Sequence, residues 1–126
     1  MTATRPAISY VENGRPWFVM TCQGTQTSIQ VRGFDAAQQW PQPTLTVAFG
    51  AVQHSAKPDL QMVGDQTAFS FAYPISTNML KAFRDGAPIK ASYHGETRLF
   101  PAASPAVRGQ FASRCAALVP PGMRQG

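Results

Sequence analysis

The chain has few side chains that could do polar chemistry: two cysteines, two histidines and six carboxylates. Cys22 ends the apolar run RPWFVMTCQG, and Cys115 follows 93 residues later in FASRCAALV. Zinc sites need close-spaced ligand pairs, which neither cysteine has. A cysteine nucleophile would need a nearby base, and His54 and His94 are the only histidines. Three interpretations therefore stand at this point: a disulfide, two separate buried thiols, or a catalytic or metal-bound thiol.

The carboxylates are dispersed along the chain and form no catalytic motif. Most of them flank predicted turns, where acidic side chains cap the turn and keep the surface hydrated. The chain also lacks Gly-x-Ser-x-Gly, a phosphate-binding glycine loop and His-Glu-x-x-His. His94 with Glu96 is the best dyad available, and a solvated hairpin end explains the two residues more simply. We therefore predict a protein that is not an enzyme, with no catalytic residue, metal or cofactor.

Composition favours one β-rich domain. At 126 residues the chain has the length of a single domain, and charged residues make up only 13% of it. The net charge is +5, but the eleven basic residues are scattered and do not alternate with aromatic ones. This pattern argues against specific nucleic-acid binding. We expect one domain over 1–118 and a flexible C-terminal tail over 119–126.

Hydrophobic alternation predicts seven to eight short strands. The first hairpin turns at Asn13-Gly14, and its return strand, 16–22, places Phe18, Met20 and Cys22 on one face. Further strands are expected over 27–34 and 44–52, with a break in QHSAKPD. Later hairpins are expected across Asp65-Gln66 and around Gly95. Turn signals at this spacing are typical of an antiparallel β-sandwich or barrel.

Two short helices are expected, at about 76–85 and 105–118. Ser76 has the residue type of an N-cap and Gly86 that of a C-terminal stop. In the second helix Ser104 would cap and Pro105 would take the first helical position. A stripe at helical spacing should form its inner face: Val107, Phe111, Cys115 and Leu118. These helices would plug an open end of the sheets or cover an edge.

The predicted buried faces of the strand and the helix indicate how the two cysteines are used. Both cysteines fall on faces that should point at one core, so the two sulfurs could meet, and we favour a disulfide between Cys22 and Cys115. Such a bond would contribute about 4–5 kcal/mol in the chain-entropy model. Two tryptophans are candidate partner contacts: Trp17, on the opposite strand face, and Trp40, in the loop QQWPQP. Covering a sheet end is the simpler explanation of Trp40.

The segment MLKAFRDGAPIKASYHG, followed by FPAAS and FASRC, carries a resemblance to known proteins. It resembles small exported domains of the invasion-associated locus B type and is similar to accessory envelope proteins of type VI secretion. The resemblance covers about Trp17 to Cys115 and implies an envelope location and a β fold, with the cysteines as a structural pair. The early strand that ends in Cys22 is also similar to periplasmic lysozyme inhibitors of the C type. The chain lacks the Ser-Gly loop by which that family enters the lysozyme cleft.

These observations lead to an expected function. We predict a non-enzymatic periplasmic or secreted binding or accessory protein that acts through contacts with a protein partner or an envelope component. One alternative is a periplasmic inhibitor or immunity protein of a hydrolase. Another is a small structural subunit of a larger envelope or membrane-associated assembly. The terminus MTATRPAISY has no apolar signal region, so export would require a signal peptide that has been removed. No segment has the about 20 apolar residues of a transmembrane helix.

Overall fold

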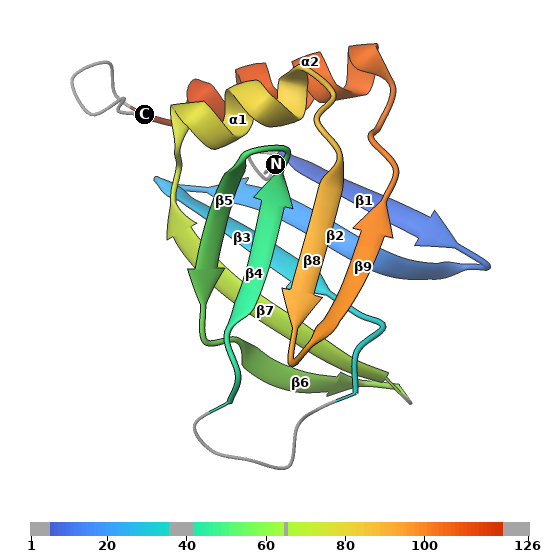
Figure 1. Cartoon of the computed structure of the whole chain (residues 1–126). Helices are drawn as coiled ribbons and strands as arrows, with labels where there is room; N and C mark the ends of the chain where they lie inside the picture. The colour runs from blue at the N-terminus through green and yellow to red at the C-terminus, as the bar shows by residue number, and fades with distance from the viewer. Residues whose placement is uncertain (1–5, 36–41, 65, 120–126) are drawn as a thin grey trace.

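The computed structural model describes residues 6–35, 42–64 and 66–119. In these ranges nine strands form two antiparallel sheets, and two helices lie side by side across one end of the sheets (Figure 1). The strands are β1 (Ala7–Glu12), β2 (Arg15–Gln23), β3 (Gln26–Val31), β4 (Leu45–Phe49), β5 (Val52–Ala56), β6 (Asp59–Val63), β7 (Gln66–Pro74), β8 (Ile89–Tyr93) and β9 (Glu96–Phe100). The helices are α1 (Thr77–Arg84) and α2 (Pro105–Ala116).

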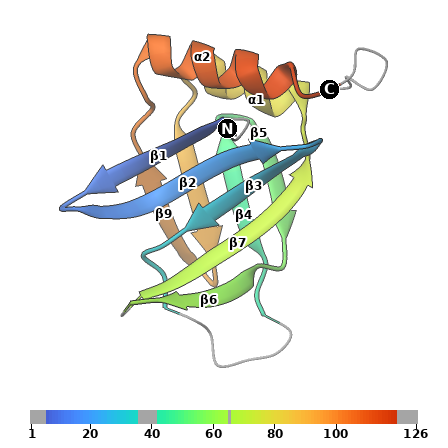
Figure 2. The same cartoon turned by 180° about the vertical axis from the view of Figure 1, so that it is seen from behind.

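The five-stranded sheet has the order β1-β2-β3-β7-β6, and the four-stranded sheet has the order β5-β4-β8-β9. The two sheets pack face to face with their strands crossing, and Figure 2 shows the five-stranded sheet from its outer side. The chain leaves the first sheet after β3 and returns to it through β6 and β7. The prediction of a mainly β, sandwich-like fold with two helices is confirmed.

Strand alternation builds the core as expected. On β2 the side chains of Phe18, Met20 and Cys22 are buried, while Trp17 and Val19 on the other face are partly exposed. Aromatic rings from both sheets meet in the interior, where Phe69 and Tyr93 have centroids 4.7 Å apart. Burial of apolar surface from two facing sheets is the main favourable term for such a layered fold.

Two tight turns follow from local sequence. Asn13 and Gly14 have φ values of 55° and 75°, and His94 and Gly95 have values of 50° and 81°. Two consecutive residues at positive φ match the twist of the strands that they join. Both predicted hairpins, β1–β2 and β8–β9, are therefore present.

One strand was missed in the sequence analysis, which expected a break after residue 52. Instead the chain turns at Gly50, where φ is 63°, and β5 pairs with β4 along its whole length. The alternation of apolar and polar residues in β5 is hard to recognise in the sequence because one of its inward residues is a histidine. The ring of His54 stacks on Tyr73 at 4.5 Å, so an aromatic contact replaces the usual aliphatic one. The count is thus nine strands in the described residues, not seven to eight.

Helix α1 begins and ends as predicted. The Ser76 hydroxyl accepts a hydrogen bond of 3.2 Å from the backbone N–H of Met79. Gly86 follows the C-cap with φ at 84°, which suits a residue without a side chain. Met79, Leu80 and Phe83 face the core, as expected.

Helix α2 begins at Pro105 as predicted, but Ser104 makes no side-chain capping bond. Its inner face is also rotated from the expected stripe. Phe111 and Cys115 are buried, whereas Val107 and Leu118 are 45% and 38% exposed. Phe111 and Cys115 of the expected stripe thus lie on the true inner face together with Ala112, and Leu118 lies beyond the helix, which ends at Ala116 instead of 118. The small side chain of Ala112 allows α1 to pack against α2. Packing between the two helices therefore determines which face of α2 is buried.

The described chain ends at Val119, the first residue of the expected tail. Its side chain is 5% exposed, and its backbone N–H donates to the carbonyl oxygen of Ala116 at 3.2 Å. The packed domain thus reaches one residue further than 118. The rest of the predicted tail, 120–126, lies outside the described residues.

Candidate binding site

The two cysteines are joined. Cys22 and Cys115 form a disulfide with their Cα atoms 5.6 Å apart, and neither side chain is exposed. The bond ties the end of β2, in the five-stranded sheet, to α2. The disulfide prediction is confirmed, and the bonded sulfurs are neither free thiols nor metal ligands.

Trp17 lies on the outer face of the five-stranded sheet, against the backbone at the exit from β3. A Cβ atom built on Gly33 would lie 3.3 Å from two carbons of the indole ring, and Gly33 has a φ of 106°. Glycine is therefore required here both for the backbone conformation and for the close approach of the ring. The indole Nε1 donates a hydrogen bond of 3.2 Å to the carbonyl oxygen of Glu12. Trp17 is thus held at both ends of its ring.

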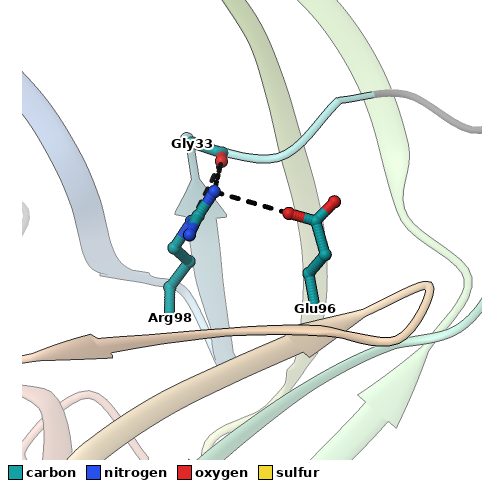
Figure 3. A network of polar contacts seen from close by, with 3 residues as sticks. All are labelled: Gly33, Glu96 and Arg98. Carbon is teal, nitrogen blue, oxygen red and sulfur yellow. Dashed lines mark hydrogen bonds and ion pairs between the residues drawn. The ribbon is translucent and has the colours of Figure 1, made fainter.

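Arg98 reaches the same place from the other sheet. Its Nε and Nη2 donate hydrogen bonds of 3.0 and 2.8 Å to the carbonyl oxygen of Gly33, as Figure 3 shows. Its guanidinium carbon lies 5.6 Å from the ring centroid of Phe34, and Nη2 lies 3.5 Å from a carboxylate oxygen of Glu96. Arg98 therefore links edge strand β9 to the chain that leaves β3, across the open side of the two layers.

These residues border a surface hollow of about 420 Å³. We call it the Trp17 surface; its lining residues are Trp17, Gly33, Phe34, Asp35, Gln66, Thr67 and Arg98. The lining combines an indole, a guanidinium, a carboxylate, an amide and a hydroxyl. Tryptophan and arginine are the side chains most enriched among residues that dominate protein–protein binding energy. The arrangement is suited to recognition.

The other sequence candidates fall elsewhere. His54 is stacked between the sheets, and His94 lies in the β8–β9 turn with a positive φ. Glu96, the carboxylate of the His94–Glu96 dyad considered in the sequence analysis, pairs with Arg98. Within the described ranges, no three His, Cys, Asp or Glu side chains are grouped as metal ligands. Trp40, the second predicted contact, lies outside the described residues.

Trp17 was a candidate partner contact from the sequence, whereas Gly33, Phe34 and Arg98, which line the same hollow, were not indicated by it. Arg98 is 65 positions from Gly33, and nothing in the spacing of the two connects them. One available signal was Gly33 itself, inside the strand expected over 27–34, because glycine within a strand often marks the close approach of another group.

The comparisons with known proteins add nothing further: no family model, curated protein or solved structure matches this chain. Among the helices of the described residues, none is long and apolar enough to cross a membrane.

Proposed function

We propose that the protein is a non-enzymatic binding or accessory protein that engages a protein partner through the Trp17 surface. The observation that carries the proposal is the meeting of Trp17 and Arg98, from different sheets, at one exposed hollow. Both side chains are held by hydrogen bonds to backbone carbonyl groups, so little of their conformational freedom remains to be lost on binding. Preorganised aromatic and arginine side chains give affinity at low entropic cost.

We further propose that the protein works in the periplasm or outside the cell. The support is the disulfide, because such bonds form and persist in oxidising compartments and are rare in the cytosol. Mass analysis under non-reducing conditions, on protein matured in its native compartment, tests this. A mass lower than that of the reduced chain by two hydrogen atoms is expected, and two alkylatable thiols would contradict the proposal.

The contact itself can be tested by photo-crosslinking in a cell-envelope extract. A benzophenone side chain replacing Asp35 lies at the Trp17 surface, whereas one replacing Ser55 lies on the outer face of the other sheet. We expect a discrete cross-linked partner from position 35 and none from position 55. Trp17→Ala should abolish the product, while the control Val19→Ala, on the same strand and face, should retain it.

Once the partner is identified, its affinity gives the second measurement. Loss of an indole at the centre of a binding site typically costs at least about 2 kcal/mol, which is about 30-fold in Kd. Equal cross-linking from both positions, or an affinity that Trp17→Ala leaves unchanged, would overturn the proposed site.

A second candidate function is inhibition of a hydrolase. It is favoured by the charged groups at this surface, where Asp35 lines the hollow with Arg98 and Glu96 pairs with Arg98. Charged groups held in fixed positions favour a partner site of complementary charge. Stoichiometric protein should then inhibit a peptidoglycan hydrolase, and Arg98→Ala should lose the effect. Full hydrolase activity in the presence of excess protein would exclude this candidate.

A further inference from the structure

The helical layer carries a groove that the proposed function does not use. It runs between α1 and α2 and has a volume of about 400 Å³. Figure 1 places the two helices at one end of the sheets, and none of the residues that line the groove also lines the Trp17 surface. The groove is therefore separate from the Trp17 surface.

The two walls of the groove differ in chemistry. The α2 wall consists of the small residues Gly109, Ser113 and Ala116, so it projects little from the helix. The α1 wall carries longer polar side chains: Thr77, Asn78, Lys81 and Arg84. Buried Leu80 and Ala112 form the floor. Such a groove is open enough to admit a chain segment, with hydrogen-bonding groups along one side.

The charge in the groove is one-sided. Lys81 and Arg84 lie on one face of α1, three residues apart, and no carboxylate is among the residues that line the groove. Asp85 touches Arg84, but the distance from Nε to Oδ1 is 3.6 Å and both side chains are more than half exposed. A pair so exposed contributes little and leaves the guanidinium able to bind a second anion.

The walls are fixed before any ligand binds. Arg108 of α2 donates from Nε to the carbonyl oxygen of Arg84 at 3.1 Å, and from Nη1 to the carbonyl oxygen of Ala103. The rings of Phe83 and Phe111 pack at 5.5 Å beneath the helices. The disulfide at Cys115 holds α2 to the sheet. A groove with fixed walls binds without the cost of ordering them.

We propose that the groove between α1 and α2 binds an acidic segment of a partner protein. Carboxylates of the segment would accept two parallel hydrogen bonds from Arg84 and a charge-assisted bond from Lys81. Asn78 and Ser113 would meet its polar backbone groups. The concave shape favours a peptide over a flat lipid surface, and the absence of aromatic side chains from the lining disfavours single-stranded nucleic acid.

The test uses the full disulfide-bonded protein and a fluorescein-labelled dodecapeptide rich in glutamate, followed by fluorescence anisotropy. The peptide should bind at about 10 mM ionic strength and more weakly at about 150 mM, where the Debye length falls from about 30 to about 8 Å. A lysine-rich peptide of the same length should not bind.

Two double variants separate the groove from net charge. Lys81→Gln/Arg84→Gln removes the groove cations, and Lys57→Gln/Lys90→Gln removes the same charge from exposed positions in the β5–β6 connection and on β8. We expect the first pair to weaken binding about tenfold or more and the second about twofold at most, since only the first removes charge-assisted hydrogen bonds to the peptide. Circular dichroism confirms that each variant is folded. Ser113→Trp, which fills the groove without changing charge, should also weaken binding.

Three results would overturn the proposal. Equal weakening by both double variants would show that net charge alone attracts the peptide. Unchanged binding by Ser113→Trp would place the peptide elsewhere. Binding to vesicles with anionic lipid, but not to the peptide, would assign the basic helices to a membrane surface instead. Trp17→Ala should leave peptide binding intact, so this test and the test of the Trp17 surface succeed or fail separately.

Discussion

Single side chains connect the two layers of this protein. Arg98 is the clearest case, because its guanidinium bonds the carbonyl oxygen of Gly33 while its strand belongs to the other sheet. Its geometry explains why a charged residue occupies an inward position of β9, opposite buried Ala91. An inward charge on an edge strand also discourages pairing with another chain. The same arginine thus closes the fold and lines the proposed binding surface.

The burial of Tyr73 predicts how the stability of the protein depends on pH. Burial raises the pKa of its phenol well above the ordinary value of about 10. A raised pKa in the folded state means that the neutral phenol is favoured by folding. Its contribution to stability is therefore fully present below about pH 10 and is lost as the pH rises beyond it.

We expect the free energy of unfolding, measured by urea denaturation, to decline above about pH 10, and Tyr73→Phe to flatten that decline. Tyr10→Phe is the control. Its hydroxyl donates to Glu12 at the surface, and this bond, more than burial, raises the pKa of Tyr10. A decline equally steep in wild type and Tyr73→Phe would contradict the assignment.

At the scale of elements, the helical layer depends on how α1 ends. Gly86 has a positive φ, and a Cβ atom there would lie 3.1 Å from the guanidinium carbon of Arg108. Arg108 donates a hydrogen bond to the carbonyl oxygen of Arg84, the last residue of α1, so the end of one helix and the start of the next share one contact. This contact between Arg84 and Arg108, at the junction of the two helices, fixes their spacing and therefore the shape of the groove between them.

Two glycine substitutions should act in opposite directions. Gly86→Ala should lower the free energy of unfolding by about 1–2 kcal/mol, because a left-handed conformation disfavours a side chain and the methyl group meets Arg108. Gly109→Ala should raise it by about 0.5–1 kcal/mol, because Gly109 is inside α2 with open space around it. Urea denaturation measures both. A loss of stability in Gly109→Ala as large as that in Gly86→Ala would show that the junction is not the cause.

At the scale of the whole molecule, one bond joins the first sheet to the last helix. The disulfide spans 93 positions, and both cysteines are part of the single core cluster that both sheets and both helices share. Cross-linking a loop of this length mainly restricts the unfolded chain in the entropy model.

The double variant Cys22→Ala/Cys115→Ala should therefore lose about 2–5 kcal/mol of unfolding free energy. Because α2 packs through one face only, hydrogen exchange should increase in α2 more than in β2 and β3. Wild-type protein treated with reductant should show the same loss. If the variant and the oxidised protein unfold at the same urea concentration, the bond contributes nothing to stability.

Local sequence determined the features that depend on neighbouring residues. The pair Asn13-Gly14 specified a hairpin turn, alternation placed Phe18 in the core, and Ser76 capped α1, because φ preferences and side-chain periodicity act within a few residues. The prediction of the disulfide used the same periodicity, because Cys22 and Cys115 both fell on faces expected to be buried.

Tertiary structure decided what distant residues do together. Pairing of β3 with β7 aligns Val31 with Phe69, although the chain between these strands first passes through the second sheet. Arg98 donates a hydrogen bond to Gly33, which is 65 positions away in the sequence. The rotation of α2, which exposes Val107, was set by its packing against α1. Such contacts depend on the register and crossing of whole strands and helices, which no local pattern fixes, because many pairings bury similar apolar surface and only the complete core selects one.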